Sequence, residues 1–262
     1  MKTFTLILVS LFSFGQPMVK SKPVSTGEEL QFRLSYGWFT IGRGTFKISD
    51  DYVMLDGKEC LEINVEGGTA GLAGVFSRVD DRWGAIIDKD TFLPYYSYRD
   101  LSEGDYELDE KVYFDYDEMK IRFEQSTPSE NKPRPTRYFD IEKSNMFDMM
   151  GGLMYARSID YRSLKKGDTI RMDAFFDKKF YDFEMIYGGI EMIKTKVGEI
   201  YCHRVVPILE KNSVFDGHDA VTFWVSADGN RLPLKVKANM NFGTAYCELT
   251  AYKNVKSGID FN

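Results

Sequence analysis

The sequence has few of the residues that carry chemistry. It contains two histidines, and its three cysteines never form the Cys-x-x-Cys spacing of a metal or redox site. An odd number of cysteines leaves at least one thiol unpaired, so no disulfide framework is implied. The lone positions of Cys60, Cys202 and Cys247 inside apolar segments indicate small buried side chains, and a single Cys202–Cys247 bridge is the alternative.

Positive charge is also scarce. The chain has 34 Lys and Arg against 40 Asp and Glu, which gives a formal net charge of -6. Binding to a polyanion requires a dominant basic surface, so the composition argues against a nucleic acid as partner. Beyond the N-terminus, no apolar run has the length of a membrane helix, and we expect no transmembrane segment.

Residues 1–15 have the pattern of a secretory signal peptide. Lys2 precedes a short apolar run, and small residues follow that run up to Gly15. The run is short for a bilayer span, and no cysteine follows it to take a lipid anchor. The pattern predicts cleavage near Gly15 and a periplasmic or secreted mature protein, with residues 16–26 as a polar leader.

Alternation of apolar and polar residues dominates the remaining chain. Leu30, Phe32, Leu34 and Tyr36, for example, fall on one face of an extended segment. A hydrophobic content of 43% with 15% aromatic residues suffices for a sizeable core. The pattern predicts a mainly β protein with one large curved antiparallel sheet or open barrel, formed by a single domain over residues 27–255.

Two halves of the chain share an order of landmarks. Each half opens on a Gly, reaches a Trp 56 or 57 positions later, passes a polar turn holding Asp, and begins a new strand at Leu-Pro. We infer an ancient tandem duplication, with pseudo-repeats over about 27–141 and 167–255 that merge edge to edge. The shared landmarks are Gly27, Trp83 and Leu93-Pro94 in the first half, and Gly167, Trp224 and Leu232-Pro233 in the second.

The segment between the two halves has a different period. Its apolar residues recur at three- and four-residue spacings, which predicts a helix over about 145–160 with Ser144 or Asn145 as its cap. Packing of this methionine-rich stripe against the sheet is the favoured interpretation, and contact with a ligand is the alternative, because Met adapts its shape to its neighbours. The candidate ligand-binding residues are Trp83, Met149, Met150, Met154 and Trp224.

No residue is assigned a catalytic role. Cys202 and His203 are neighbours in a strand and point to opposite faces, while Ser213, His218 and Asp219 are crowded into one turn without a nucleophile elbow. The sequence therefore favours a protein without enzymatic activity but does not decide the question, and it indicates neither a cofactor nor a metal. An envelope hydrolase is the least favoured alternative, with paired acids as its candidates on paper: Asp80-Asp81, Asp109-Glu110 and Asp115/Asp117.

The landmarks in this order resemble a bacterial family of exported β proteins, catalogued as domain of unknown function 3108. The similarity covers roughly Thr26 to Tyr252, and its motifs are Gly27-Glu28-x-Leu30, Thr69 to Phe76, Asp88 to Pro94, Met146 to Arg157, Gly167-Asp168, Gly198 to Pro207 and Trp224 to Pro233. The resemblance implies an exported open-barrel-like sheet, similar in shape to periplasmic lipoprotein carriers, and it carries over no catalytic residue.

Two functions remain open at this point. The first is binding or carriage of a lipid or other apolar molecule in a concave groove, which a strongly bent sheet with a helix across it would form. The second is a scaffold or interaction role in the cell envelope, with an envelope protein as partner and the groove filled by the protein's own side chains.

Overall fold

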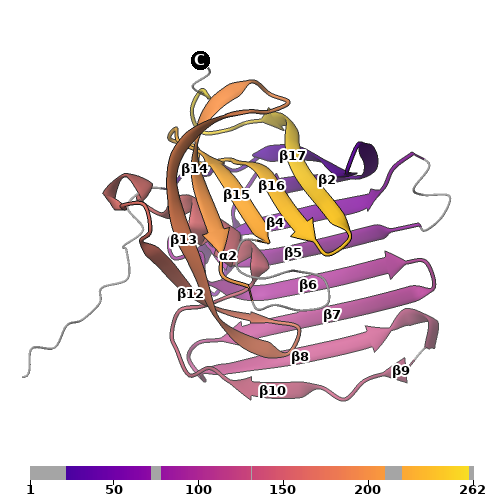
Figure 1. Cartoon of the computed structure of the whole chain (residues 1–262). Coiled ribbons are helices and arrows are strands. Elements are labelled where there is room, and N and C mark those ends of the chain that lie inside the picture. The colour runs from indigo at the N-terminus through magenta and orange to yellow at the C-terminus, as the bar shows by residue number, and fades with distance from the viewer. Residues whose placement is uncertain (1–21, 72–77, 131, 210–219, 260–262) are drawn as a thin grey trace, which may run out of the picture.

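The computed structural model describes residues 22–71, 78–130, 132–209 and 220–259 (Figure 1). The expected signal peptide lies outside these ranges. Within them there are one α-helix, α2 (Met149–Ser158), and two 3-10 turns, η1 (Pro128–Glu130) and η2 (Tyr161–Ser163). The strands are β1 (Glu29–Tyr36), β2 (Phe39–Ile48), β3 (Val53–Leu55), β4 (Lys58–Thr69), β5 (Asp80–Asp88), β6 (Pro94–Glu103), β7 (Tyr106–Asp115), β8 (Lys120–Thr127), β9 (Lys132–Pro133), β10 (Arg137–Asp140), β11 (Met146–Phe147), β12 (Thr169–Phe176), β13 (Lys179–Lys194), β14 (Glu199–Pro207), β15 (Val221–Ser226), β16 (Pro233–Met240) and β17 (Gly243–Lys253).

The described strands form a single 17-stranded sheet. From β1 the pairing runs one way through β2, β4, β5, β6, β7 and β8 to β10, and the other way through β17, β16, β15, β14, β13 and β12 to β11. The first and last strands therefore meet in the middle of the sheet. Every pair is antiparallel except β11–β12, and no strand pair of the described chain joins β10 to β11 or β12, so the sheet stays open. The predicted fold class is confirmed.

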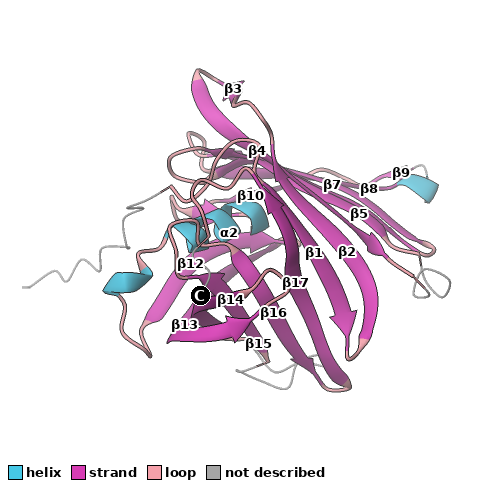
Figure 2. Cartoon of the chain, turned by 90° about the horizontal axis from the view of Figure 1, so that it is seen from above, coloured by secondary structure: helices cyan, strands magenta, loops and turns pink. Residues whose placement is uncertain are grey.

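The helix occupies the space between the two arms of this bent sheet. Figures 1 and 2 show α2 between the strands of the first half, β4 to β10, and those of the second half, β12 to β15. It contacts β5, β11 and β12. Met154 and Tyr155 are buried in one core cluster with strand residues from both halves. Nowhere in the described ranges is a helix long and apolar enough to cross a membrane.

The helix begins later than its apolar spacing predicts. Asp148 is its N-cap, and the Asp148 Oδ1 accepts a hydrogen bond of 2.7 Å from the backbone N–H of Gly151. The predicted caps Ser144 and Asn145 both precede β11, whose extended backbone pairs with β12. Apolar spacing alone does not distinguish a short buried strand from the first turn of a helix, which is why the predicted start at 145 was wrong.

The two Trp-to-Pro segments form hairpins of the same construction. Asp88 and Asp228 each accept backbone N–H bonds from the turn residues that follow them. A residue with positive φ, Phe92 at 61° or Arg231 at 47°, then precedes each Leu-Pro pair, and a register shift lies where each Pro pairs. The hairpins are thus locally equivalent, while the duplication and its boundaries stay predictions.

All three cysteines are free thiols in this structure. Cys60 and Cys202 are buried and Cys247 is half-buried, so the alternative of a Cys202–Cys247 bridge is wrong. Burial raises the pKa of the Cys202 thiol to about 12 and that of Cys247 to about 11. At neutral pH both are protonated, which suits small packing side chains rather than nucleophiles.

Candidate functional site

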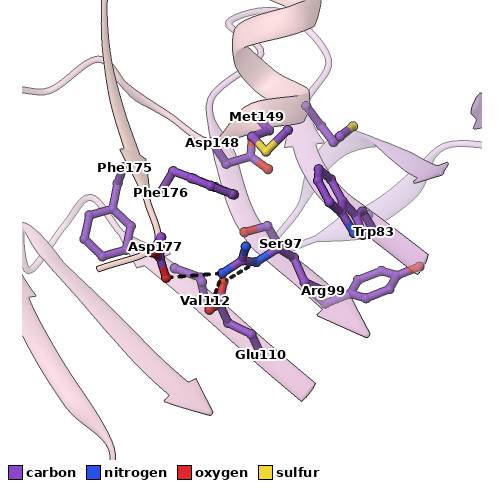
Figure 3. Close-up of a pocket in the computed structure, with 13 residues that line it drawn as sticks. Trp83, Ser97, Arg99, Glu110, Val112, Asp148, Met149, Phe175, Phe176 and Asp177 are labelled. Carbon is purple, nitrogen blue, oxygen red and sulfur yellow. Dashed lines mark hydrogen bonds and ion pairs between the residues drawn. The ribbon is translucent and has the colours of Figure 1, made fainter. Parts of the chain in front are cut away.

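A small cavity lies where the helix start, three strands of the first half and the β12–β13 hairpin meet (Figure 3). Its volume is about 30 Å³. Its walls combine aromatic and methionine side chains with a few polar groups. The lining residues are Trp83, Gly84, Ser97, Tyr98, Arg99, Glu110, Val112, Asp148, Met149, Met150, Phe175, Phe176 and Asp177.

A row of side chains across β5, β6 and β7 borders this cavity. The sheet register places Trp83 opposite Arg99 and Arg99 opposite Glu110. Arg99 donates from Nε and Nη2 to the two carboxylate oxygens of Glu110, at 2.8 and 2.7 Å. Glu110 is 3% exposed. Both of its oxygens are therefore engaged in a bidentate pair with one guanidinium, which joins β6 to β7.

The same arginine attaches the second half of the chain to the first. Its guanidinium lies 4.5 Å from the centroid of the Phe176 ring, and its Nη2 is 3.6 Å from Asp177 Oδ1. Figure 3 shows the ion pair of Arg99 with Asp177 as a dashed line. Phe176 and Asp177 stand at the β12–β13 turn, whereas Arg99 belongs to β6. A cation–π contact and one ion pair at the same guanidinium thus hold this hairpin against the first-half strands.

The helix cap provides a further carboxyl group at the cavity, besides Glu110 and Asp177. Asp148 is buried, and loss of hydration raises its pKa to about 6, although the N–H of Gly151 acts in the opposite direction. A carboxyl group with this pKa changes its charge within a physiological pH range. Its position at the first turn of α2 links that charge to the stability of the helix.

Only part of the predicted ligand-binding set comes together at this cavity. Trp83, Met149 and Met150 line it, and the indole Nε1 of Trp83 is buried without a hydrogen-bond partner. Met154 is fully buried in the core, and the Trp224 indole instead donates to Glu191 Oε1 at 2.5 Å. Ligand binding by the three lining residues stays a prediction.

A buried ion pair that sequence reasoning missed fixes the other end of the helix. Arg157 and Glu28 are 1% and 0% exposed, and Arg157 donates to the two carboxylate oxygens at 2.6 and 2.9 Å. The Nη2 of Arg157 also donates to the carbonyl oxygens of Pro23 and Asn230. One guanidinium therefore joins α2, the N-terminal segment and the β15–β16 hairpin. Its only signal in the sequence was a single cation within an apolar helical stripe.

The described histidine is a packing residue. His203 is 2% exposed, its ring stacks on Tyr161 with centroids 4.7 Å apart, and its Nδ1 lies 2.9 Å from the hydroxyl oxygen of Tyr187. Burial lowers its pKa to about 4, so it is neutral at pH 7. The described residues contain no cluster of three His, Cys, Asp or Glu side chains placed to hold a metal ion. The turn residues considered for hydrolysis lie outside the described ranges: Ser213, His218 and Asp219.

A larger but open hollow runs along β2 and β4. Its volume is about 520 Å³. Two basic and two acidic residues are among the described residues that line it: Arg43, Arg78, Glu66 and Asp80. Because the two signs balance, the hollow has no net charge that would select an anion or a cation.

Comparison with known proteins places the chain in a family. The model of the family described as protein of unknown function DUF3108 matches residues 31–250. The chain belongs to this family. The resemblance inferred from the ordered motifs is thus confirmed, and no curated protein matches the chain.

Solved structures extend the comparison to the fold of this DUF3108 protein. A β-barrel-like protein of domain of unknown function DUF1849 from Brucella abortus is 9% identical, with a TM-score of 0.57 over 89% of this chain and 100% of the other. At this identity the match supports the fold alone. An exported protein with a YmcC-like fold from Bacteroides fragilis is 11% identical, with a TM-score of 0.40 over 88% and 98% of the two chains. A lipoprotein from Parabacteroides distasonis is 9% identical, with a TM-score of 0.31 over 91% and 100%. The last two similarities are too low to support an argument.

Proposed function

We propose that this DUF3108 protein is exported to the cell envelope and acts there through its outer surface, as a scaffold or interaction protein. The signal-peptide pattern of residues 1–15 supports export. The small volume of the cavity beside α2 supports the surface role. Of the two functions that the sequence left open, the geometry favours the one without an enclosed ligand.

The observation that carries this proposal is the size of the cavity beside the helix. A site of about 30 Å³ has room for roughly two water molecules, since one water needs about 10–15 Å³ measured in this way. Pockets for small organic ligands span roughly 300–1,000 Å³. An acyl chain does not fit beside α2 while the helix is in place.

The attachment of the helix strengthens the argument. The last turn of α2 is attached to the rest of the fold by the buried pair of Arg157 with Glu28, whereas the Asp148 cap is a bond within the helix itself. Removing α2 from the sheet exposes Met150, Met154 and Tyr155, at a cost of about 1.5–3 kcal/mol for each large apolar side chain. A ligand therefore opens the interior only if its binding free energy exceeds the free energy lost when these side chains are exposed.

Lipid extraction from the purified full-length protein tests the proposal. We expect organic extraction followed by mass spectrometry to recover far less than one lipid per protein chain. We also expect Trp emission to stay unchanged when fatty acids of increasing chain length are added to the detergent-free protein. Stoichiometric recovery of one lipid class, or a saturable emission shift, would instead establish an internal ligand and overturn the proposal.

One observation favours carriage of an apolar molecule as a second candidate function. The Trp83 Nε1 is a buried donor without a partner, and it belongs to a residue that lines the cavity together with Met149 and Met150. A ligand with an apolar body and one acceptor group satisfies such a donor if α2 shifts. Glu28→Gln keeps the size of the side chain but removes the negative charge that pairs with Arg157, so α2 is held less firmly. If the protein carries an apolar molecule, this variant should bind fatty acid more tightly than wild type, because less free energy is needed to shift α2. Equal absence of binding in both proteins excludes carriage.

A further inference from the structure

Two hairpin tips lie side by side at one end of the strands in the middle of the sheet. β1 pairs with β2 on one side and with β17 on the other, so Tyr36 stands opposite both Phe39 and Ala245. The backbone N–H of Gly37 donates to the carbonyl oxygen of Thr244 at 3.0 Å. The Tyr36 hydroxyl donates to the carbonyl oxygen of Phe242, which joins the β1–β2 tip to the β16–β17 tip. Figure 2 shows these four strands running together to the same edge.

This edge, which we term the aromatic edge, comprises residues 34–42 and 238–247 and exposes large apolar side chains. Trp38 is 98% exposed, Phe39 75% and Phe242 68%. Leu34 and Ile41 on the same hairpin are 37% and 36% exposed. Single exposed apolar residues are ordinary in soluble proteins, but three exposed aromatic rings on two adjoining tips are a concentration of apolar surface of the kind that marks a binding surface.

The aromatic edge also lacks charge. Neither of its two segments, nine and ten residues long, contains Asp, Glu, Lys or Arg. Charged residues make up 28% of the chain, so nineteen average positions would hold about five of them. An uncharged tip avoids the large desolvation penalty of an ionised side chain when it enters an apolar medium.

A charged row behind the tips is net positive, and Lys237, opposite Tyr246, is a further cation nearer the tips. Across β2, β1, β17 and β16 the register places Arg43 opposite Arg33, Arg33 opposite Glu248, and Glu248 opposite Lys235. Glu248 is paired with Arg33 at 2.7 Å and with Lys235 at 3.2 Å. Three cations against one anion leave a net charge of +2 in a chain whose total is -6.

We propose that the aromatic edge docks on the surface of a phospholipid bilayer. Trp38, Phe39 and Phe242 insert at the boundary between headgroups and acyl chains, and the row that contains Arg33 and Arg43 faces the lipid phosphates. The tips protrude as turns rather than forming a groove, and a fluid interface accepts a protruding ring without a complementary socket. This inference deepens the proposed function, because it names the surface through which the protein acts and the partner of that surface.

Vesicle sedimentation with the full-length protein tests the docking site. We expect wild type to co-sediment with vesicles of phosphatidylethanolamine and phosphatidylglycerol and its Trp emission to shift to the blue. A variant with Trp38→Ser, Phe39→Ser and Phe242→Ser should lose roughly tenfold or more of its partition coefficient, because the inserted apolar area is removed. Its thermal midpoint should match wild type, since the three rings are exposed.

Two further variants make the test specific. Tyr106→Ser with Tyr138→Ser removes aromatic rings that are 53% and 66% exposed on other hairpins and should leave partitioning unchanged. Arg43→Gln should weaken binding to vesicles that contain phosphatidylglycerol several-fold, because the variant loses one attraction to the anionic lipid surface. Its binding to vesicles of pure phosphatidylcholine, which have no net charge, should change little.

Three outcomes overturn the docking proposal. They are absence of wild-type sedimentation with either vesicle, sedimentation that survives the triple serine change, and self-association in ultracentrifugation that the same change abolishes. The last outcome assigns the edge to a second copy of the chain and leaves the surface role intact. The lipid extraction described above tests the filled interior separately, so failure of the docking site and failure of the proposed function are distinguishable.

Discussion

The interior around α2 and the aromatic edge are both apolar, but the fold treats them in opposite ways. Around α2, the side chains of Met150, Met154 and Tyr155 are buried in one core with residues of both arms of the sheet, and the cavity beside them has a volume of about 30 Å³. At the aromatic edge, Trp38, Phe39 and Phe242 are left in solvent. Apolar surface that folding covers contributes to stability, and apolar surface that folding leaves uncovered is available for contact with a partner. Substitutions in the two regions should therefore affect different measurements.

The largest effect is expected at the buried pair. Arg157→Met leaves the Glu28 carboxylate buried without its partner and should cost about 3–5 kcal/mol of unfolding free energy, measured by urea denaturation. Combining it with Glu28→Leu should recover most of this loss, because no uncompensated charge then remains. As a control, Lys253→Ala removes the exposed ion pair with Glu29 and should leave the unfolding midpoint unchanged. Equal losses of unfolding free energy in Arg157→Met and Lys253→Ala would show that burial of the Arg157–Glu28 pair does not increase its contribution to stability.

Next in size is the contrast between two methionines of the same helix. Met154 is fully buried and Met149 is 41% exposed. Met154→Ala should cost about 2–5 kcal/mol through lost burial and a residual cavity. Met149→Ala should cost less than about 1 kcal/mol. If thermal unfolding shows the two losses to be equal, α2 does not present Met154 to the core as described.

Titration of Asp148, the helix cap, is expected to change the unfolding free energy by at most about 3 kcal/mol. The pKa of Asp148 is about 6 in the folded chain, against the ordinary value of 3.8 that applies to the unfolded chain. Between these two pH values the folded state therefore binds a proton that the unfolded state has lost. Raising the pH through this window lowers wild-type stability by about 3 kcal/mol, at 1.36 kcal/mol per pKa unit.

Asp148→Asn keeps a capping side chain and lacks this titration. The stability of the variant relative to wild type should therefore increase with pH from about 4 to about 6.5 and then level off. The buried His203 has the opposite sign, since its lowered pKa makes stability rise with pH, but it is present in both proteins and cancels from the difference. A difference that is flat across this range contradicts the assignment.

The smallest effect is expected at the aromatic edge. Trp38→Ser should change the unfolding free energy by less than about 0.5 kcal/mol, because the ring is 98% exposed. Urea denaturation without lipid is the measurement. A loss comparable to that of Met154→Ala would show that Trp38 packs against the protein and is not available for docking.

The hairpin construction was predictable from the sequence, and the start of the helix was not. An Asp turn before Leu-Pro defines local backbone geometry, and the turns at Asp88 and Asp228 form as their sequences indicate. The apolar residues Met146 and Phe147 fit a helical stripe as well as they fit a strand. Only their pairing with β12 decides that their backbone is extended. The cap at Asp148 follows from that pairing.

The candidate site was predictable only in part. Trp83, Met149 and Met150 were chosen because large apolar residues suit a groove, and the fold brings these three together. Nothing local shows that Met154 turns fully into the core or that the indole of Trp224 bonds to Glu191. The pairing of Glu28 with Arg157 joins residues 129 positions apart, which no spacing rule reaches.

By itself the sequence determined the alternating strands and their turns, because period and turn chemistry act over a few residues. Tertiary structure alone decided that the first and last strands meet in the middle of the sheet, that α2 fills the space between its arms, and that two uncharged hairpin tips adjoin. These features depend on which distant segments pair, and that choice is made by burial summed over the whole chain rather than by any one stretch of it.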